Sequence, residues 1–214
     1  MPGGSPLEEG RIEQILWLTD LSATAAACSG TVRWLATLAQ RAGEEPASVR
    51  VVHLLATAEP SLRAKALAAC SALAGDLGSI GLDAEPAVFE SSDTESLADG
   101  VRALCAAEAV DLCVLGRHPE GRGRLARALG AQGGPALLLV QEPSRLPPWA
   151  VGCAAPRQDA GAWRIAQALA GAGGAREVDR EATPGARPDL RVQPWDALAG
   201  DRLVGGNLLL VGGR

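Results

Sequence analysis

The side chains best suited to nucleophilic or metal chemistry are few in this sequence, and their spacing gives them no shared site. The two histidines, His53 and His118, lie far apart, and no GxSxG or Walker pattern occurs. The five cysteines are odd in number, and no two of them form a CxxC pair. We therefore predict no catalytic residue and no metal site, and we expect reduced thiols that pack as small hydrophobes. These cysteines are Cys28, Cys70, Cys105, Cys113 and Cys153.

A glycine- and arginine-rich segment, residues 116–131, has the composition of a phosphate-binding loop. Glycine lets backbone N–H groups approach phosphate oxygens, and Gly121 and Gly123 could build such a cradle with arginine charge beside it. Pro119 has no N–H to donate, and Glu120 repels phosphate. The pattern favours a turn that only joins a strand to a helix, with phosphate binding as the alternative. The arginines of this stretch are Arg117, Arg122, Arg124 and Arg127.

Several polar residues lie where apolar runs end. Asp20 and Ser22 follow the run 15–18, where such residues cap a helix or contact a ligand, and capping is the favoured interpretation. His118 follows a later apolar run, at the carboxyl end of a predicted strand, where open α/β sheets place ligands. His53 lies inside a run, which favours a hydrogen-bonded core residue. Three carboxylates before a predicted helix are interpreted as cap and dipole residues: Glu90, Asp93 and Glu95.

Short apolar runs alternate with helical patterns over the first 145 residues. Runs that are apolar on both faces, separated by helices, predict a parallel sheet covered on both sides, and right-handed crossovers make it doubly wound. The predicted strands are 15–18, 49–55, 82–89, 111–115 and 136–140, of which 82–89 contains Pro86 and is expected at an edge. The predicted helices cover 28–39, 62–77, 97–105 and 122–129.

Five landmarks in this order resemble the universal stress protein family. They are Asp20 with Ser22 after the first strand, the Val51-Val52-His53-Leu54 pattern, the strand Asp111 to Gly116, His118 two residues later, and Pro135 before the last strand. The resemblance covers some 130 residues. It implies a doubly wound, parallel five-stranded sheet of the adenine nucleotide α-hydrolase-like kind.

The resemblance also implies which residues would bind a nucleotide. Members that bind ATP carry Gly-x2-Gly-x9-Gly-Ser/Thr after the fourth strand; here Pro119 takes the second glycine position, Ala131 takes the hydroxyl position, and the loop is one residue longer. The cofactor-binding positions carried over are Asp20, Leu54, Gly116, Arg117, His118, Gly121, Gly123, Gly130 and Ala131.

After a proline-rich linker at 141–148, the pattern restarts. A strand at 149–154 and a helix around 162–169 precede a segment rich in proline, glycine and charge. Residues 207–214 echo residues 111–117, which predicts a truncated α/β repeat without a phosphate cradle or a fifth strand. An unrelated α/β extension is the alternative. We accordingly predict a universal stress protein-like domain at 11–142 and a smaller, degenerate second half at 149–214.

Charge and hydropathy exclude two classes of partner. A net charge of −5 without a basic face argues against nucleic-acid binding, and no apolar run reaches the roughly eighteen residues of a membrane span. The polar, acidic start of the chain does not resemble a secretion signal, so a cytoplasmic protein is expected.

The favoured function is a non-catalytic stress-response module that acts through protein contacts and binds ATP weakly or not at all, so that no cofactor is expected. An ATP- or AMP-binding switch and an adenine-nucleotide hydrolase are the alternatives. The relatives generally dimerise through the fifth strand or occur as tandem pairs. We therefore expect either pairing of the two halves within the chain, which would cover the strand 136–140, or a homodimer through that strand.

Overall fold

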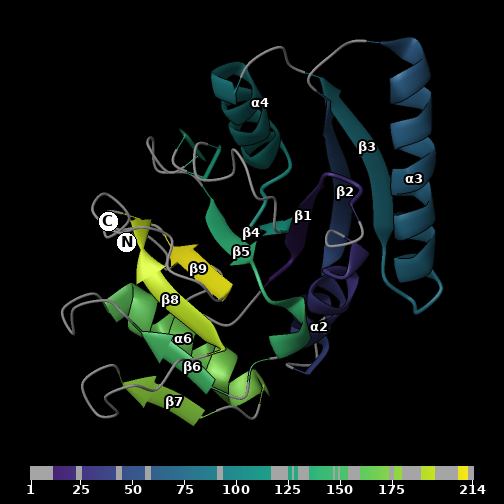
Figure 1. Cartoon of the computed structure of the whole chain (residues 1–214). Helices are drawn as coiled ribbons and strands as arrows, with labels where there is room; N and C mark the ends of the chain where they lie inside the picture. Colours follow the sequence, from purple (N-terminus) through teal and green to yellow (C-terminus); the bar gives the residue numbers. More distant parts are fainter. Residues whose placement is uncertain are drawn as a thin grey trace.

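In the computed structural model, the strands of the described residues form one nine-stranded sheet (Figure 1). The residues that the structure describes are 12–22, 26–41, 45–55, 59–90, 94–116, 125–126, 128–129, 135–146, 148, 150–153, 160–173, 176–179, 189–195 and 207–211. No helix in these ranges is long and apolar enough to cross a membrane.

The first five strands confirm the predicted doubly wound class. They are β1 (Gln14–Thr19), β2 (Ser48–Leu55), β3 (Ala84–Glu90), β4 (Leu112–Gly116) and β5 (Ala136–Val140). All run parallel in the spatial order β3-β2-β1-β4-β5. The strand with Pro86 lies at the edge of the sheet, as predicted, because proline cannot donate to a second neighbour.

Helices cover both faces of this part of the sheet (Figure 1). The helices are α2 (Ser29–Arg41), α3 (Pro60–Gly78) and α4 (Thr94–Ala107). Successive residues of β1 point to opposite faces, so Trp17 packs in the core under α2 and α3, and Leu16 packs in the core under α4. The second core also takes up Leu125 and Leu129, which lie in the predicted helix at 122–129. Strands buried on both faces explain the apolar runs of the sequence.

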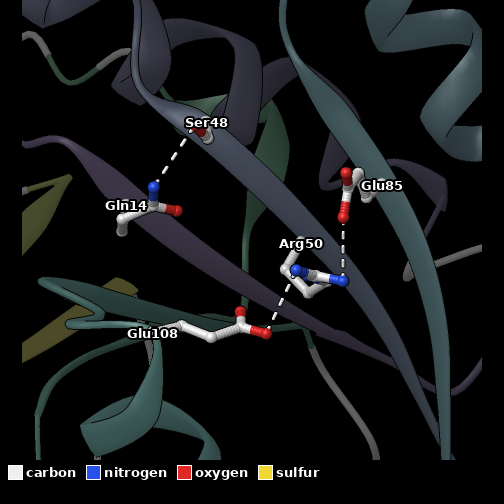
Figure 2. Close-up of polar contacts among 5 residues, drawn as sticks. All are labelled: Gln14, Ser48, Arg50, Glu85 and Glu108. Atoms are coloured by element: carbon white, nitrogen blue, oxygen red, sulfur yellow. Dashed lines mark hydrogen bonds and ion pairs between the residues drawn. The ribbon is translucent and has the colours of Figure 1, made fainter.

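A small polar network holds the amino ends of the strands together (Figure 2). Arg50 of β2 forms ion pairs with Glu85 of β3, at 2.9 Å, and with Glu108 just after α4, at 3.1 Å. The side-chain amide of Gln14 in β1 donates to Ser48 Oγ in β2 at 3.3 Å. Arg50 therefore joins two strands to the end of the helix that crosses them.

The sheet does not end at β5, as a five-stranded domain would. The second half adds β6 (Ala150–Cys153), β7 (Arg176–Asp179), β8 (Leu190–Pro194) and β9 (Asn207–Val211), in the order β9-β8-β6-β7 after β5. β9 pairs antiparallel with β5, whereas β6, β7, β8 and β9 run parallel to one another. A short 3-10 helix, η2 (Pro143–Arg145), and α6 (Ala160–Gly173) complete the described elements.

The prediction that residues 207–211 match the fourth strand of the first half, which leaves the fifth place empty, is wrong. Going outward from the central pair, β9, β8, β6 and β7 take the places that β5, β4, β1 and β2 take in the first half. Among the described strands, β3 at the far edge has no counterpart. The sequence echo placed β9 fourth, but hydrogen bonding to β5 and β8 places it fifth. β7 was also missed, because Arg176–Asp179 contains a single apolar residue.

One core runs across the junction of the two halves. Leu138 and Val140 of β5, Leu209 and Val211 of β9, and residues of α2 and α6 belong to the same buried cluster. The helices α2 and α6 therefore cover the same face of the sheet.

Asn207 fastens this junction. Its Oδ1 accepts hydrogen bonds from the backbone N–H groups of Gln141 and Glu142, both at 2.9 Å. Its Nδ2 donates to the carbonyl oxygens of Glu142 and Asp189, both at 3.0 Å. The side chain is 2% exposed, and all four of its hydrogen-bonding positions are used. Asn207 thus holds the chain leaving β5, the chain entering β8 and the start of β9.

Candidate functional site

The candidate site lies at the carboxyl ends of β1 and β4. From β1 the chain passes to β2 on one side, whereas β4 lies on the other side, so the strand order reverses between β1 and β4. Open α/β sheets bind ligands at such a switch point, because the diverging connections leave a crevice. Asp20 follows the last residue of β1, and Gly116 is the last residue of β4. The structure therefore brings these two predicted residues to neighbouring strand ends.

The turn after β1 is closed by its own side chains. Thr19 Oγ1 accepts from the Leu21 N–H at 3.0 Å, and Asp20 Oδ1 accepts from the Ser22 N–H at 3.0 Å. Leu21 has a φ of 60°, in the left-handed region that a leucine rarely adopts. Two backbone donors at this strand end, the N–H groups of Leu21 and Ser22, are thus already satisfied.

The carboxylate of Asp20 accepts from the backbone N–H two residues ahead, in an Asx turn. An N-cap side chain accepts from the same N–H position, so this bond does not separate a capping residue from a ligand contact. Residues 23–25 lie outside the described part of the chain, and the capping interpretation of Asp20 stays a prediction.

His53 is held at the neighbouring strand end. Its Nδ1 lies 2.9 Å from the carbonyl oxygen of Thr19, its register partner in β1, and donates to that oxygen. This bond sets the tautomer with the proton on Nδ1. The half-buried ring thus joins β2 to the turn that contains Asp20. The prediction of a hydrogen-bonded residue, rather than a catalytic base, agrees with this contact.

The remaining predicted contact residues divide between the described and the undescribed parts of the chain. Leu54 lies near the end of β2 and packs against the core under α4. Gly116 is buried and lies opposite Val140 of β5. The others lie outside the described residues and stay predictions: Arg117, His118, Gly121, Gly123, Gly130 and Ala131.

One residue near this segment was missed by sequence reasoning. Arg102 of α4 donates through its guanidinium to the carbonyl oxygen of Ala128 and pairs with Asp99 one turn earlier. It therefore anchors the chain two residues before Gly130. The Asp99–Arg102 spacing, three residues apart on a helix, indicates an ion pair, but no sequence pattern indicates the contact with Ala128.

The structure describes one of the three carboxylates before α4, Glu90. Glu90 ends β3 and pairs with Arg63 of α3, with 3.5 Å between its Oε1 and Nε of the arginine. Glu90 therefore balances a cation on the facing helix and is not a cap residue of α4, contrary to prediction. Asp93 lies outside the described residues, and the structure does not describe the side chain of Glu95.

The thiols match their prediction, and the site offers no catalytic set among the described side chains. All five cysteines are buried, and none of them forms a disulfide. Within the described ranges, no three His, Cys, Asp or Glu residues cluster as metal ligands. Burial raises the pKa of the Cys70 thiol, and the bond to Cys105, followed by burial, raises the pKa of Cys113 well above its ordinary value. Neither thiol is an activated nucleophile at neutral pH.

Comparison with known proteins finds structural likeness only. No family model and no curated protein matches the chain. A protein of the universal stress protein family from Burkholderia pseudomallei is 20% identical, with 61% of this chain and 97% of that chain covered and a TM-score of 0.47. The chain is similar in fold to universal stress proteins.

Two further structures give comparable values. A universal stress protein in complex with cAMP is 15% identical, with 61% of this chain and 97% of that chain covered and a TM-score of 0.45. A universal stress protein from Archaeoglobus fulgidus is 17% identical, with 60% and 98% covered and a TM-score of 0.45. The order of β1 to β5 independently gives the fold that the sequence landmarks predicted.

Proposed function

We propose that this chain is a non-catalytic, universal stress protein-like module of the stress response that acts through protein contacts, and that its second half takes the place of a partner subunit. The observation that carries the proposal is the antiparallel pairing of β5 with β9. Leu137, Leu138 and Leu139 lie opposite residues of the same chain, and β4 occupies the other side of β5. Neither side of β5 is open to a second copy.

The buried surface supports the same proposal. The apolar strand β5 would be exposed at the edge of a sheet if the chain ended after Val140, and such an edge invites aggregation. β9 covers it with Leu208, Leu209 and Leu210, which are 0–7% exposed. The second half thus covers β5 as a second subunit would.

The turn after β1 supports the proposal of weak or no nucleotide binding. The N–H groups of Leu21 and Ser22 already donate to Thr19 and Asp20, so they are not available to bind a phosphate. In the sequence, Pro119 removes one donor from the loop that would hold the phosphates. We infer that this module acts through a regulatory surface and not through a catalytic site.

Size-exclusion chromatography with light scattering tests whether the chain is a monomer. Thermal unfolding with ATP, AMP or cAMP and magnesium tests whether a nucleotide binds at the switch point. We expect a monomer at all concentrations and no rise in melting temperature. A ligand at a hundredfold its dissociation constant would add about 2.7 kcal/mol and raise the midpoint by several degrees. A dimer would contradict the proposal that the second half takes the place of a partner subunit.

A nucleotide switch is the second candidate, favoured by the meeting of Asp20 and Gly116 at the switch point of the sheet. It predicts a midpoint shift with ATP or AMP that Gly121→Val abolishes, because the valine side chain crowds the proposed backbone donor. A shift that Gly121→Val leaves unchanged would contradict that loop geometry. Release of inorganic phosphate from ATP, measured in the same samples, separates the switch from a hydrolase; we expect none.

A further inference from the structure

Two cysteines at the junction of α4 and β4 hold their sulfur atoms in contact. Cys105 Sγ lies 3.4 Å from Cys113 Sγ, within hydrogen-bonding distance for sulfur. Cys105 lies in the last turns of α4, and Cys113 lies in the interior of β4, so both belong to the core on this face of the sheet. Neither residue has a role in the proposed function.

The connection between the two cysteines is held in place by hydrogen bonds. The Val110 N–H donates to the carbonyl oxygen of Cys105 at 2.8 Å, across Ala109, which has a φ of 50°. This is the left-handed turn that commonly ends a helix. Asp111 then donates its N–H to the Gln14 carbonyl at 3.0 Å and accepts from the Gln14 N–H through Oδ2 at 3.0 Å. The two sulfurs are therefore positioned by backbone anchored on both sides.

The two thiols differ in exposure. Cys113 is fully buried, and its hydrogen bond with Cys105, followed by burial, raises its pKa. Cys105 is 5% exposed and lies near the end of α4. Opening of the last helical turn would admit a small oxidant to Cys105 first.

We propose that Cys105 and Cys113 form a dithiol site that a hydroperoxide oxidises to an intramolecular disulfide. Cys105, as thiolate, attacks a peroxide oxygen; the O–O bond breaks, the leaving hydroxide takes up a proton, and sulfenic acid and water result for hydrogen peroxide. Cys113 then loses its proton as its sulfur attacks the Cys105 sulfur, and the sulfenic hydroxyl leaves as a second water. In total, two thiols lose two electrons to one peroxide. A dithiol reductant reverses the step by thiol–disulfide exchange.

The disulfide would act directly on the candidate site. Its formation brings the two sulfurs from 3.4 Å to about 2.05 Å and joins α4 covalently to β4. β4 ends at Gly116, three residues beyond Cys113, at the switch point of the sheet. The oxidised state therefore stiffens the strand that leads to the candidate site. The dithiol itself does not depend on whether a nucleotide binds there.

Digestion with trypsin gives a direct test on the wild-type protein. Cleavage after Arg102 and after Arg117 releases residues 103–117, which contain Cys105 and Cys113 and no other cysteine. Cys70 falls in the separate peptide 66–102, where it is the single cysteine and serves as an internal reference. The folded protein is treated with hydrogen peroxide, quenched, denatured, alkylated and digested.

We expect peptide 103–117 to lose both alkylation sites together and to become two hydrogens lighter, while the Cys70 peptide stays alkylated. Treatment with dithiothreitol before alkylation restores both sites. Full alkylation of peptide 103–117 at a peroxide dose that oxidises Cys70 would overturn the proposal. So would accumulation of sulfinic or sulfonic acid on this peptide without the disulfide.

Two alanine variants assign the roles of the sulfurs, and both keep a small apolar side chain in the core. In Cys113→Ala, a sulfenic acid on Cys105 has no partner thiol, and we expect dimedone to label it. In Cys105→Ala, we expect Cys113 to remain alkylatable at the same dose, because it is the more deeply buried thiol. If dimedone labels Cys113 in the Cys105→Ala variant and does not label Cys105 in the Cys113→Ala variant, the assignment of Cys105 as the attacking thiol is overturned.

Discussion

Leu138 of β5 lies directly opposite Leu209 of β9, at the centre of the three residue pairs that join the two halves of the sheet. Both side chains are almost fully buried and belong to the core shared by α2 and α6. The pairs on either side, Leu137 with Leu210 and Leu139 with Leu208, lie symmetrically about this contact. The junction therefore consists of leucine on both strands, and its stability depends on close packing rather than on charge.

We predict that Leu209→Ala destabilises the whole protein by about 2–5 kcal/mol, because it removes buried methyl groups and leaves a cavity at the junction. Urea unfolding at equilibrium measures this change. Leu67→Ala is the matched control: Leu67 lies on α3 and is 42% exposed, so a loss below about 0.5 kcal/mol is expected. Equal effects of the two substitutions would contradict the central position of Leu209.

Asn207→Ala should be among the most destabilising single substitutions outside the apolar core. It leaves two backbone N–H groups and two carbonyl oxygens at the junction without their partner, each at about 1–3 kcal/mol if water does not replace it. We expect a total loss of about 3 kcal/mol or more by urea unfolding. Gln14→Ala, which removes a single 3.3 Å bond to Ser48, should cost about 1 kcal/mol. A loss of that smaller size for Asn207→Ala would refute the junction role.

Two glycine-to-alanine substitutions in helices should act in opposite directions. A Cβ on Gly100 of α4 would overlap the aromatic ring of Phe89 in β3, whereas a Cβ on Gly75 of α3 meets nothing within 4 Å. We expect Gly100→Ala to destabilise by about 1–3 kcal/mol through overpacking. Gly75→Ala should stabilise by up to about 1 kcal/mol, because alanine has the higher helix propensity. Thermal unfolding measures both variants. The double variant Gly100→Ala with Phe89→Leu checks the cause, because the smaller leucine side chain should recover the stability that Gly100→Ala loses.

The raised pKa of Cys113 predicts a loss of stability in alkaline solution. The folded state holds this proton more tightly than the unfolded state does, so its contribution is present below the ordinary thiol pKa of 9.0 and is lost as the pH rises toward the folded value. The free energy of unfolding of wild type minus that of Cys113→Ala should therefore fall between pH 8 and about pH 10. A difference that stays constant over this range would show that neither the bond with Cys105 nor burial raises the pKa of Cys113 in the folded state.

The sequence predicted the first half of the fold because its strands are apolar on both faces. Runs such as 15–18 and 136–140 leave no alternative position except the interior of a sheet. The strand β7 was not predicted because Val178 is the only apolar residue of Arg176–Asp179, and the position of this strand depends on its pairing with β6. β9 was assigned the wrong place because local likeness to 111–117 carries no information about which neighbour a strand pairs with.

The candidate site was predicted less completely than the fold. Asp20 and Gly116 follow from strand-end positions, which a sequence pattern locates. The bond from His53 to the Thr19 carbonyl and the contact of Arg102 with Ala128 depend on which elements are neighbours. Residue spacing could not indicate these contacts, because 34 residues separate the first pair and 26 separate the second.

The pairing of β5 with β9 has a consequence for how the protein responds to its own abundance. Two separate subunits part when they are diluted below their dissociation constant, whereas strands joined within one chain meet at an effective concentration that dilution does not change. The completed sheet therefore persists even at a few molecules per cell. The two halves also belong to one chain, so each molecule presents both of them together to whatever it contacts.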